Sequence, residues 1–229
     1  IVHFFPNIPG WKEVGLKNIL ETRLKLPVFL DNDSNLMCLA ESKLGAARGF
    51  KNAACLTLGT GVGGGLIIEG NLYRGSNFAA AELGHIPLNE KGPACNCGGV
   101  ACLETYIGNN RLKIKAKRLF GRDISLEELS QQARQKNPQA LKLWYDAARH
   151  LGIALTGVVN LLNPEVIVIG GGVANAGEVL FAQVKKIILK RAMSVQAKQV
   201  KILKARLGSD AGLIGAAILV NSHSDLCRT

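Results

Sequence analysis

Long hydrophobic runs are missing from this sequence, although 48% of its 229 residues are hydrophobic. No run approaches the roughly 20 apolar residues that a membrane-spanning helix needs, so a membrane-embedded function is excluded. A secretory signal pattern is missing as well. The sequence begins at Ile1 rather than at a methionine, and it enters directly into a stretch with structured patterning. We therefore expect a fragment of a globular protein that lacks its true N-terminus.

Aromatic residues are scarce, at 5%, whereas the net charge of +11 is strongly basic. Such a charge can indicate nucleic-acid binding. The lysines and arginines are dispersed, however, and alternate with apolar residues at helix or strand spacing, without an interleaved aromatic stripe. Solvated faces and attraction for an anionic substrate such as a nucleotide therefore explain the charge better. We expect no nucleic-acid partner unless a helix-turn-helix segment precedes this chain.

Six cysteines are too few for a disulfide framework in a chain of this length. Three of them, Cys95, Cys97 and Cys102, lie within eight residues, and with His85 they offer three thiolates and one imidazole. That donor set suits a closed, structural zinc site, which we favour over a cluster of free thiols. Such an ion would fix the surrounding loop rather than activate water. The cysteine pattern also indicates a reduced, cytoplasmic setting.

A glycine-dense turn, Gly59-Thr-Gly-Val-Gly-Gly-Gly65, joins two apolar runs. Gly59, Gly61 and Gly64 formally match G-x-G-x-x-G, but a strand rather than a helix follows, so the dinucleotide-binding mechanism does not apply. What remains is a hairpin turn whose backbone N–H groups are unshielded by side chains, with the Thr60 hydroxyl beside them. Such a nest can hold phosphate oxygens. A hairpin without a ligand is an equally good interpretation of the turn alone.

An acidic residue, Asp33, stands between an apolar strand and a helix. Capping the helix, a role that Asp31, Ser34 and Asn35 can share, is the commoner function of such an aspartate, and spacing alone favours it. The alternative is a general base, because a carboxylate at a strand end can accept the proton of a substrate hydroxyl during phosphoryl transfer. Asn32 can both donate and accept hydrogen bonds, which suits a sugar hydroxyl.

Hydrophobic periodicity predicts an α/β fold. The predicted elements are, in chain order, a helix at 11–24, a strand at 27–30, a helix at 36–48, a three-strand meander at 53–58, 64–68 and 72–74, a helix that begins after Ser125, a long helix at 138–162, a strand at 164–169, a helix to residue 189, a strand at 200–204 and a helix at 213–220. Residues 51–229 then form a βββαβαβ lobe, and residues 1–50 form the tail of another lobe. This order predicts a cleft between two lobes, with ligands bound where strands end.

Together these motifs resemble the ROK family of sugar kinases and repressors, which has the ribonuclease H-like, two-lobe fold of the actin-like/hexokinase superfamily. The matching motifs are Asn32-Asp-Ser-Asn35, Leu58-Gly-Thr-Gly-Val-Gly-Gly-Gly65, Glu82-Leu-Gly-His85, Cys95-Asn-Cys-Gly-Gly-Val-Ala-Cys-Leu-Glu104 and Asn163-Pro-Glu-Val-Ile-Val-Ile-Gly-Gly-Gly172. The resemblance covers most of the chain, and its cysteine motif is highly specific to the family.

The resemblance implies a role for each matching residue. Asp33 looks like the catalytic base that deprotonates the 6-hydroxyl of the sugar. The implied sugar-hydroxyl ligands are Asn32, Glu82, His85 and Glu104, with His85 also holding zinc. The implied phosphate and nucleotide contacts are Gly59, Thr60, Gly61 and Gly63 in one turn, and Gly171 and Gly172 in the other.

Two departures from the family pattern affect these expectations. Ala101 stands where the family usually has glycine, and its methyl group is expected to strain the turn mildly. The Asp-x-Gly-Gly-Thr phosphate turn of the first lobe does not occur in these 229 residues. We therefore expect little kinase activity from this chain alone, and activity from its parent protein.

The resemblance implies an ATP-dependent hexose kinase, most simply a glucokinase, that uses ATP with Mg²⁺ and a structural Zn²⁺ ion. One alternative is a sugar-responsive transcriptional repressor of the same family, which an upstream helix-turn-helix segment would favour. Another is a kinase for N-acetylmannosamine or fructose, because the same residues would serve it. The family further implies a cytoplasmic homodimer whose partners are a sugar and ATP, without membrane attachment.

Overall fold

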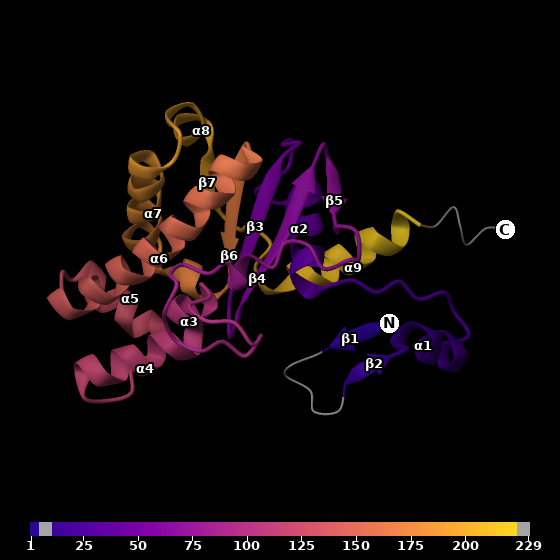
Figure 1. Cartoon of the computed structure of the whole chain (residues 1–229), viewed down its shortest axis with the longest axis horizontal. Helices are drawn as coiled ribbons and strands as arrows, with labels where there is room; N and C mark the ends of the chain where they lie inside the picture. Colours follow the sequence, from indigo (N-terminus) through magenta and orange to yellow (C-terminus); the bar gives the residue numbers. More distant parts are fainter. Residues whose placement is uncertain (5–10, 224–229) are drawn as a thin grey trace.

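The computed structural model describes residues 1–4 and 11–223, and a five-stranded mixed sheet forms its centre (Figure 1). The strand order is β5-β4-β3-β6-β7. The strands are β3 (Ala53–Leu58), β4 (Val62–Ile68), β5 (Asn71–Tyr73), β6 (Val166–Gly170) and β7 (Lys201–Lys204). The first three are antiparallel to one another, whereas β6 and β7 run parallel to β3. The predicted meander followed by two later strands is therefore confirmed.

Helices cover both faces of this sheet (Figure 1). One face carries α2 (Asp33–Leu44) and α9 (Ala211–Asn221), which pack against each other and, through α2, on β3 and β4. The other face carries α3 (Glu104–Ile107), α4 (Asn109–Phe120), α5 (Leu126–Arg134), α6 (Pro138–Leu162), α7 (Glu178–Arg191) and α8 (Ser194–Gln199). The short 3₁₀ turns are η1 (Leu83–His85), η2 (Gly172–Ala176) and η3 (Gly208–Asp210).

Alternation along the central strand divides the core into two layers. Cys55 packs with Met37 of α2 on one side, and Leu56 packs with Leu155 of α6 on the other. Every residue of β6 is buried, as expected of a parallel strand that is covered on both faces. The apolar run at 164–169 is thus explained by its central place in the sheet.

Side chains cap the starts of two helices, of which the first was predicted to begin after Ser125. The Ser125 hydroxyl accepts a hydrogen bond from the Glu128 N–H group at 3.0 Å and begins α5. The side chain of Asn137 caps α6, and Pro138 occupies its first turn. The predicted long helix at 138–162 is confirmed at both ends, because Asn163 ends it in the left-handed conformation.

The N-terminal segment departs from the sequence prediction. It contains β1 (Val2–Phe4), β2 (Lys12–Val14) and α1 (Leu16–Leu24), and it lies apart from the central sheet in Figure 1. The predicted helix at 11–24 is wrong over its first turn, which belongs to β2. No strand forms at 27–30, where the Val28 N–H group instead donates to the Glu21 carboxylate at 3.1 Å. Because α1 has no buried residue, its amphipathic pattern is not explained by packing within the described residues.

Helix α2 begins at Asp33 and ends at Leu44, so the predicted helix at 36–48 is displaced toward the N-terminus. Helix α2 packs on β3 and β4 of the central sheet. The predicted domain boundary near residue 50 stays a prediction. Among residues 1–4 and 11–223, none of the helices combines the length and hydrophobicity that a bilayer crossing demands.

Candidate functional site

The start of β4 lies against three segments that carry predicted site residues. A side chain at Gly63 would overlap the hydroxyl of Ser34, which is next to Asp33. A side chain at Gly61 would overlap a carboxylate oxygen of Glu104, and one at Gly64 would overlap the backbone beside Glu82. The glycines of this turn therefore allow close approach of neighbouring segments. Because these glycines have no side chains, the segments that carry Asp33, Glu82 and Glu104 can all pack against the start of β4.

Asn32, rather than Asp33, caps helix α2. The Asn32 side-chain oxygen accepts a hydrogen bond from the Ser34 N–H group at 2.8 Å. The carboxylate of Asp33 is exposed and accepts only a 3.3 Å hydrogen bond from the Ser34 hydroxyl within the described residues. The capping role considered for Asp33 is thus filled by its neighbour, which leaves the Asp33 carboxylate available to a ligand.

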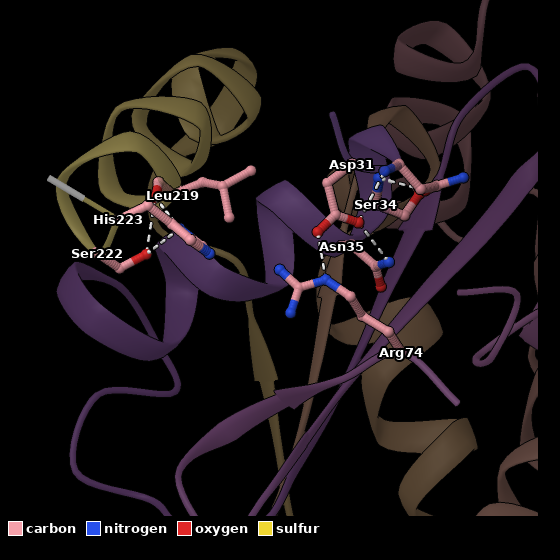
Figure 2. Close-up of polar contacts among 8 residues, drawn as sticks. Asp31, Ser34, Asn35, Arg74, Leu219, Ser222 and His223 are labelled. Atoms are coloured by element: carbon pink, nitrogen blue, oxygen red, sulfur yellow. Dashed lines mark hydrogen bonds and ion pairs between the residues drawn. The ribbon is translucent and has the colours of Figure 1, made fainter. Parts of the chain in front are cut away.

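A partly buried ion pair fixes the start of α2 (Figure 2). The Arg74 guanidinium donates to Asp31 at 2.7 Å, and the Asp31 side chain is only 5% exposed. The other Asp31 oxygen accepts hydrogen bonds from the Asn35 amide at 2.8 Å and from the Asn32 N–H group at 2.9 Å. Residues 31–35 are therefore anchored to the chain that follows β5, which limits where Asp33 can point.

Asp33 also lines a cavity of about 490 Å³ at the carboxyl ends of β3 and β6. Ligands of open α/β sheets bind at this end of the parallel strands. Gly171 also lines this cavity, has φ of 84°, and would overlap the Leu58 carbonyl if it carried a side chain. The cavity is also lined by Gly172, Lys204, Ala205, Gly208 and Ser209. The structure thus brings the predicted base and the predicted nucleotide-side glycines into one cavity.

The turn at 59–61 is partly satisfied by its own surroundings. The Gly59 N–H group donates to the Gly61 carbonyl at 2.9 Å, and the Gly59 carbonyl accepts from the Asn109 N–H group at 2.9 Å. A carboxylate oxygen of Glu104 accepts from the Val62 N–H group at 2.8 Å. Thr60, Gly61 and Glu104 line a second cavity, of about 340 Å³. The predicted phosphate turn and the predicted sugar ligand Glu104 therefore line the same cavity, and a hydrogen bond joins Glu104 to Val62 of that turn.

The predicted zinc ligands converge. One ligand atom each from His85, Cys95, Cys97 and Cys102 lies within 4.8 Å of all the others. The Cys97 and Cys102 sulfurs are 3.7 Å apart, and the Cys95 sulfur is 3.6 Å from His85 Nδ1. A tetrahedral ion with Zn–S of about 2.3 Å and Zn–N of about 2.0 Å requires an S···S separation of about 3.8 Å and an S···N separation of about 3.5 Å. The residues present therefore fit zinc in donor type and in spacing.

Burial of Cys102 favours its neutral thiol unless a cation is bound. Desolvation, followed by hydrogen bonding with Cys97 and Cys95, raises the pKa of Cys102 to about 12. Exposed Cys97 behaves oppositely, because hydrogen bonds from the Gly99 backbone and from Cys95 lower its pKa. A divalent cation would deprotonate all three thiols.

Glu82 and His85 face each other across the short 3₁₀ turn η1. The His85 Nε2 atom lies 3.9 Å from a Glu82 carboxylate oxygen, and the Glu82 side chain is 58% exposed. Because Nδ1 of His85 faces the sulfurs, Nε2 remains on the side of Glu82. This arrangement leaves the Glu82 carboxylate accessible beside the cysteine cluster.

Sequence reasoning missed several residues that organise this site. Asp31 and Arg74 were separated by a three-strand meander, and nothing in their spacing indicates a pair. No sequence motif marks Asn109 as a site residue either. Its backbone N–H group nevertheless donates to the Gly59 carbonyl, and its side chain lies beside Gly172. Glu41 had a detectable signal, because it lies at i+4 from Met37 and i+3 from Cys38, on the apolar face of α2.

Proteins of one known family match almost the whole of this chain. The model of the ROK family matches residues 1–223. A glucokinase of Thermotoga maritima is 35% identical over 97% of this chain and 75% of its own length, and one of Halalkalibacterium halodurans is 37% identical over 94% and 70%. The xylose repressor of Bacillus subtilis is 27% identical over 96% of this chain and 57% of its own length.

Solved structures with the same fold include a kinase with both substrates represented. A ROK family glucokinase from Streptomyces griseus, in complex with glucose and AMPPNP, has a TM-score of 0.85 and 34% identity over 96% of this chain and 76% of its own. A ROK hexokinase from Thermus thermophilus has a TM-score of 0.82 and 37% identity over 96% of this chain and 74% of its own.

Proposed function

This chain belongs to the ROK family and is a hexose kinase, and we propose that its substrate is glucose, phosphorylated by ATP at the 6-hydroxyl. The observation that carries the proposal is the shared cavity of Asp33, Gly171 and Gly172, because it puts a free carboxylate opposite a glycine turn. Its volume of about 490 Å³ lies within the usual range for small-molecule sites.

Asp33 acts in this proposal as the general base. Phosphoryl transfer has a loose transition state, so catalysis depends on positioning and on neutralising charge. Asp33 accepts the proton of the attacking hydroxyl, and its position is fixed by the Asn32 cap and by the Asp31–Arg74 pair. Because Asn32 already uses its side-chain oxygen for capping, its amide N–H groups are left to contact the sugar.

Two glycine turns hold the nucleotide in this proposal. Gly59, Thr60, Gly61 and Gly63 face the phosphates, and Gly171 and Gly172 face the nucleoside. Gly171 lies against the Leu58 carbonyl, which directly precedes the first turn, so the two turns are adjacent. Mg²⁺, which arrives with ATP, supplies charge neutralisation on the phosphates when bound.

Glu82, His85 and Glu104 contact sugar hydroxyls in this proposal, because they surround the start of β4 beside Asp33. His85, Cys95, Cys97 and Cys102 would hold a structural zinc ion, which stiffens the loop between the two glutamates. The bond from Val62 to Glu104 couples this loop to the phosphate turn.

A sugar-responsive repressor is the second candidate, because xylose repressors at 27–31% identity match almost the whole chain. Two glucokinases match at higher identity, 35% and 37%, which favours the kinase. A putative N-acetylmannosamine kinase from Listeria monocytogenes, at TM-score 0.81 and 27% identity, keeps another hexose in consideration. Because these 229 residues contain no Asp-x-Gly-Gly-Thr turn, we propose little activity for the chain alone.

The test is Asp33→Asn in the full-length protein, assayed with glucose, fructose, mannose and N-acetylmannosamine. Losing a general base lowers kcat by about 10²- to 10⁴-fold, while glucose affinity stays within about threefold. Glu165→Gln is a suitable control, because Glu165 precedes β6 at the opposite end of the sheet. A variant at Asp33 with normal turnover would refute the assignment of the base, and a better sugar than glucose would correct the substrate.

A further inference from the structure

Helix α2 carries a second acidic side chain that the proposed mechanism does not use. Glu41 is completely buried. One of its carboxylate oxygens accepts a hydrogen bond from the Ala46 N–H group at 2.6 Å. The other oxygen accepts two, from the Arg206 and Leu207 N–H groups, both at 2.9 Å. One side chain therefore joins the end of α2 to the segment that follows β7.

The surroundings of Glu41 are shaped for a carboxylate. Within the described part of the chain, no lysine or arginine forms an ion pair with it, so backbone N–H groups alone compensate its burial. A side chain at Gly45 would overlap the Glu41 carboxylate, and Gly45 marks the end of the helix. An apolar residue would fill such a core position at lower cost, since an isolated buried charge is expensive. Glu41 therefore has a role beyond filling space.

The segment that Glu41 holds forms a wall of the cavity described above. Residues 204 and 205 precede the two bonded N–H groups, Gly208 and Ser209 follow them, and all four line that cavity together with Asp33. Asp33 and Glu41 are eight residues apart on one helix, which places them about 12 Å apart along its axis. The Glu41 carboxylate thus connects α2, which carries the base Asp33, to residues 204–209, which line the proposed nucleotide site.

We propose that Glu41 is a positioning residue for the nucleotide, which holds residues 205–209 against α2 so that the nucleotide wall and Asp33 keep a fixed spacing. The inference rests on the proposed function, because it takes the 490 Å³ cavity to be the nucleotide site. It predicts a selective effect. Glu41 bonds Ala46, Arg206 and Leu207, all outside the segment from Glu82 to Glu104. Asn32 and Asp33 lie at the other end of α2, where the Asp31–Arg74 pair anchors the chain, so losing Glu41 weakens nucleotide binding more than glucose binding.

The test is Glu41→Gln in the full-length protein. Glutamine keeps the shape but replaces one acceptor oxygen by an NH₂ group, which faces an N–H donor and cannot bond it. Glu165→Gln is the matched control, because the Glu165 carboxylate also accepts from two backbone N–H groups, those of Lys51 and Asn52 at 2.7 and 2.8 Å. Glu165 is exposed and precedes β6 at the opposite end from the cavity.

We expect Glu41→Gln to raise KM for ATP, and Kd for the non-hydrolysable analogue AMPPNP, by about tenfold. KM for glucose should stay within about twofold, and Glu165→Gln should change neither constant by more than that. If Glu41 had only a structural role, the substitution would lower stability without raising the constants for ATP and AMPPNP more than KM for glucose. Equal increases for both substrates, or unchanged AMPPNP affinity in a folded Glu41→Gln protein, would overturn the inference.

Hydrogen exchange on the unmutated protein tests the same idea if Glu41→Gln does not fold. AMPPNP should slow exchange of the Arg206 and Leu207 amides at least fivefold more than that of the Lys51 and Asn52 amides, because only the first pair adjoins the cavity. Equal protection of both pairs would overturn the inference. AMPPNP that fails to bind the unmutated protein would refute the proposed function itself, and this inference with it, so the two failures are distinguishable.

Discussion

Helix α2 and the segment from Glu82 to Glu104 both deliver acidic side chains to the start of β4, by different means. Helix α2 has a capped N-terminus and a face buried against β3, β4 and α9. The segment at 82–104 contains little regular structure, namely η1 and the isolated bridges Pro87–Cys102 and Ala94–Val100. Burial of apolar side chains therefore positions Asp33, whereas the stretch between the two glutamates has its cysteine and histidine cluster, proposed to bind zinc, as its main source of order.

This contrast predicts that the two regions respond differently to the same perturbation. Most residues from 89 to 100 are exposed, so apolar burial contributes little to the order of that stretch. Apolar burial of α2, by contrast, does not depend on any ion. Changes in metal content should thus affect Glu82 and Glu104 first and leave the start of α2 in place.

Cys97→Ser should have the largest effect among the changes that test this comparison. Cys97 is exposed, so the substitution removes a ligand with little loss of packing. We expect zinc to fall from about one ion per chain to almost none, and glucose affinity to fall by about 10- to 100-fold. Metal analysis and calorimetric titration with glucose measure both quantities.

Cys38→Ala is the control for that experiment, because Cys38 is buried in α2 outside the cluster. It should keep zinc and lose only about 1 kcal/mol of unfolding free energy. In the zinc-free Cys97→Ser protein, amide exchange of residues 33–41 should match that of the unmutated protein. Unchanged glucose affinity without zinc would show that the loop does not need the ion.

The same contrast explains how much of this fold the sequence could predict. The meander at 53–74 and the long helix at 138–162 follow from local periodicity and turn chemistry, and the structure agrees closely with both. The predicted strand at 27–30 was wrong, and the predicted helix at 11–24 was wrong over its first turn, because the pairing of β1 with β2 is not visible in local patterns. The cysteine cluster was predictable because metal chemistry restricts ligand type and spacing.

Contacts between distant segments were the least predictable part of the site. The capping motif around Asp33 indicated a helix start, but only the structure assigns the cap to Asn32. The bonds from Glu41 to residues 206 and 207 span more than 160 positions of the chain, as the separations of 165 and 166 show. A buried glutamate within an apolar helix face is a signal that sequence reasoning could have used.

Asp31→Asn tests the other half of the comparison, with a smaller expected effect. It removes the charge that pairs with Arg74 at 2.7 Å, in a site where the Asp31 side chain is only 5% exposed. We expect a loss of about 2 kcal/mol in unfolding free energy and a lower kcat, because Asp33 loses its anchor, while zinc is retained. Chemical denaturation, kinetics and metal analysis measure the three quantities.

Asp123→Asn is the control for the ion pair. Asp123 binds Lys117 at 2.9 Å, but its side chain is 85% exposed, so we expect almost no change in stability. If Asp31→Asn lowers stability as little as this control does, the pair with Arg74 does not fix the start of α2. If it also releases zinc, the two regions are coupled and the comparison fails.

Ala101→Gly should have the smallest effect, and its sign tests whether the cysteine loop is strained. Ala101 has φ of 56°, which confirms that a non-glycine residue occupies a left-handed position before Cys102. Glycine relieves about 1–2 kcal/mol of backbone strain there, but it loses about 0.8 kcal/mol of buried methyl group and about 0.4–1 kcal/mol through the more flexible unfolded chain. These terms nearly cancel, so the unfolding free energy should stay within about 0.5 kcal/mol and zinc should be retained. Chemical denaturation of the zinc-loaded protein measures the difference. A gain above about 1.5 kcal/mol would mean that strain dominates, and that the ion holds this loop in a conformation that its own sequence resists.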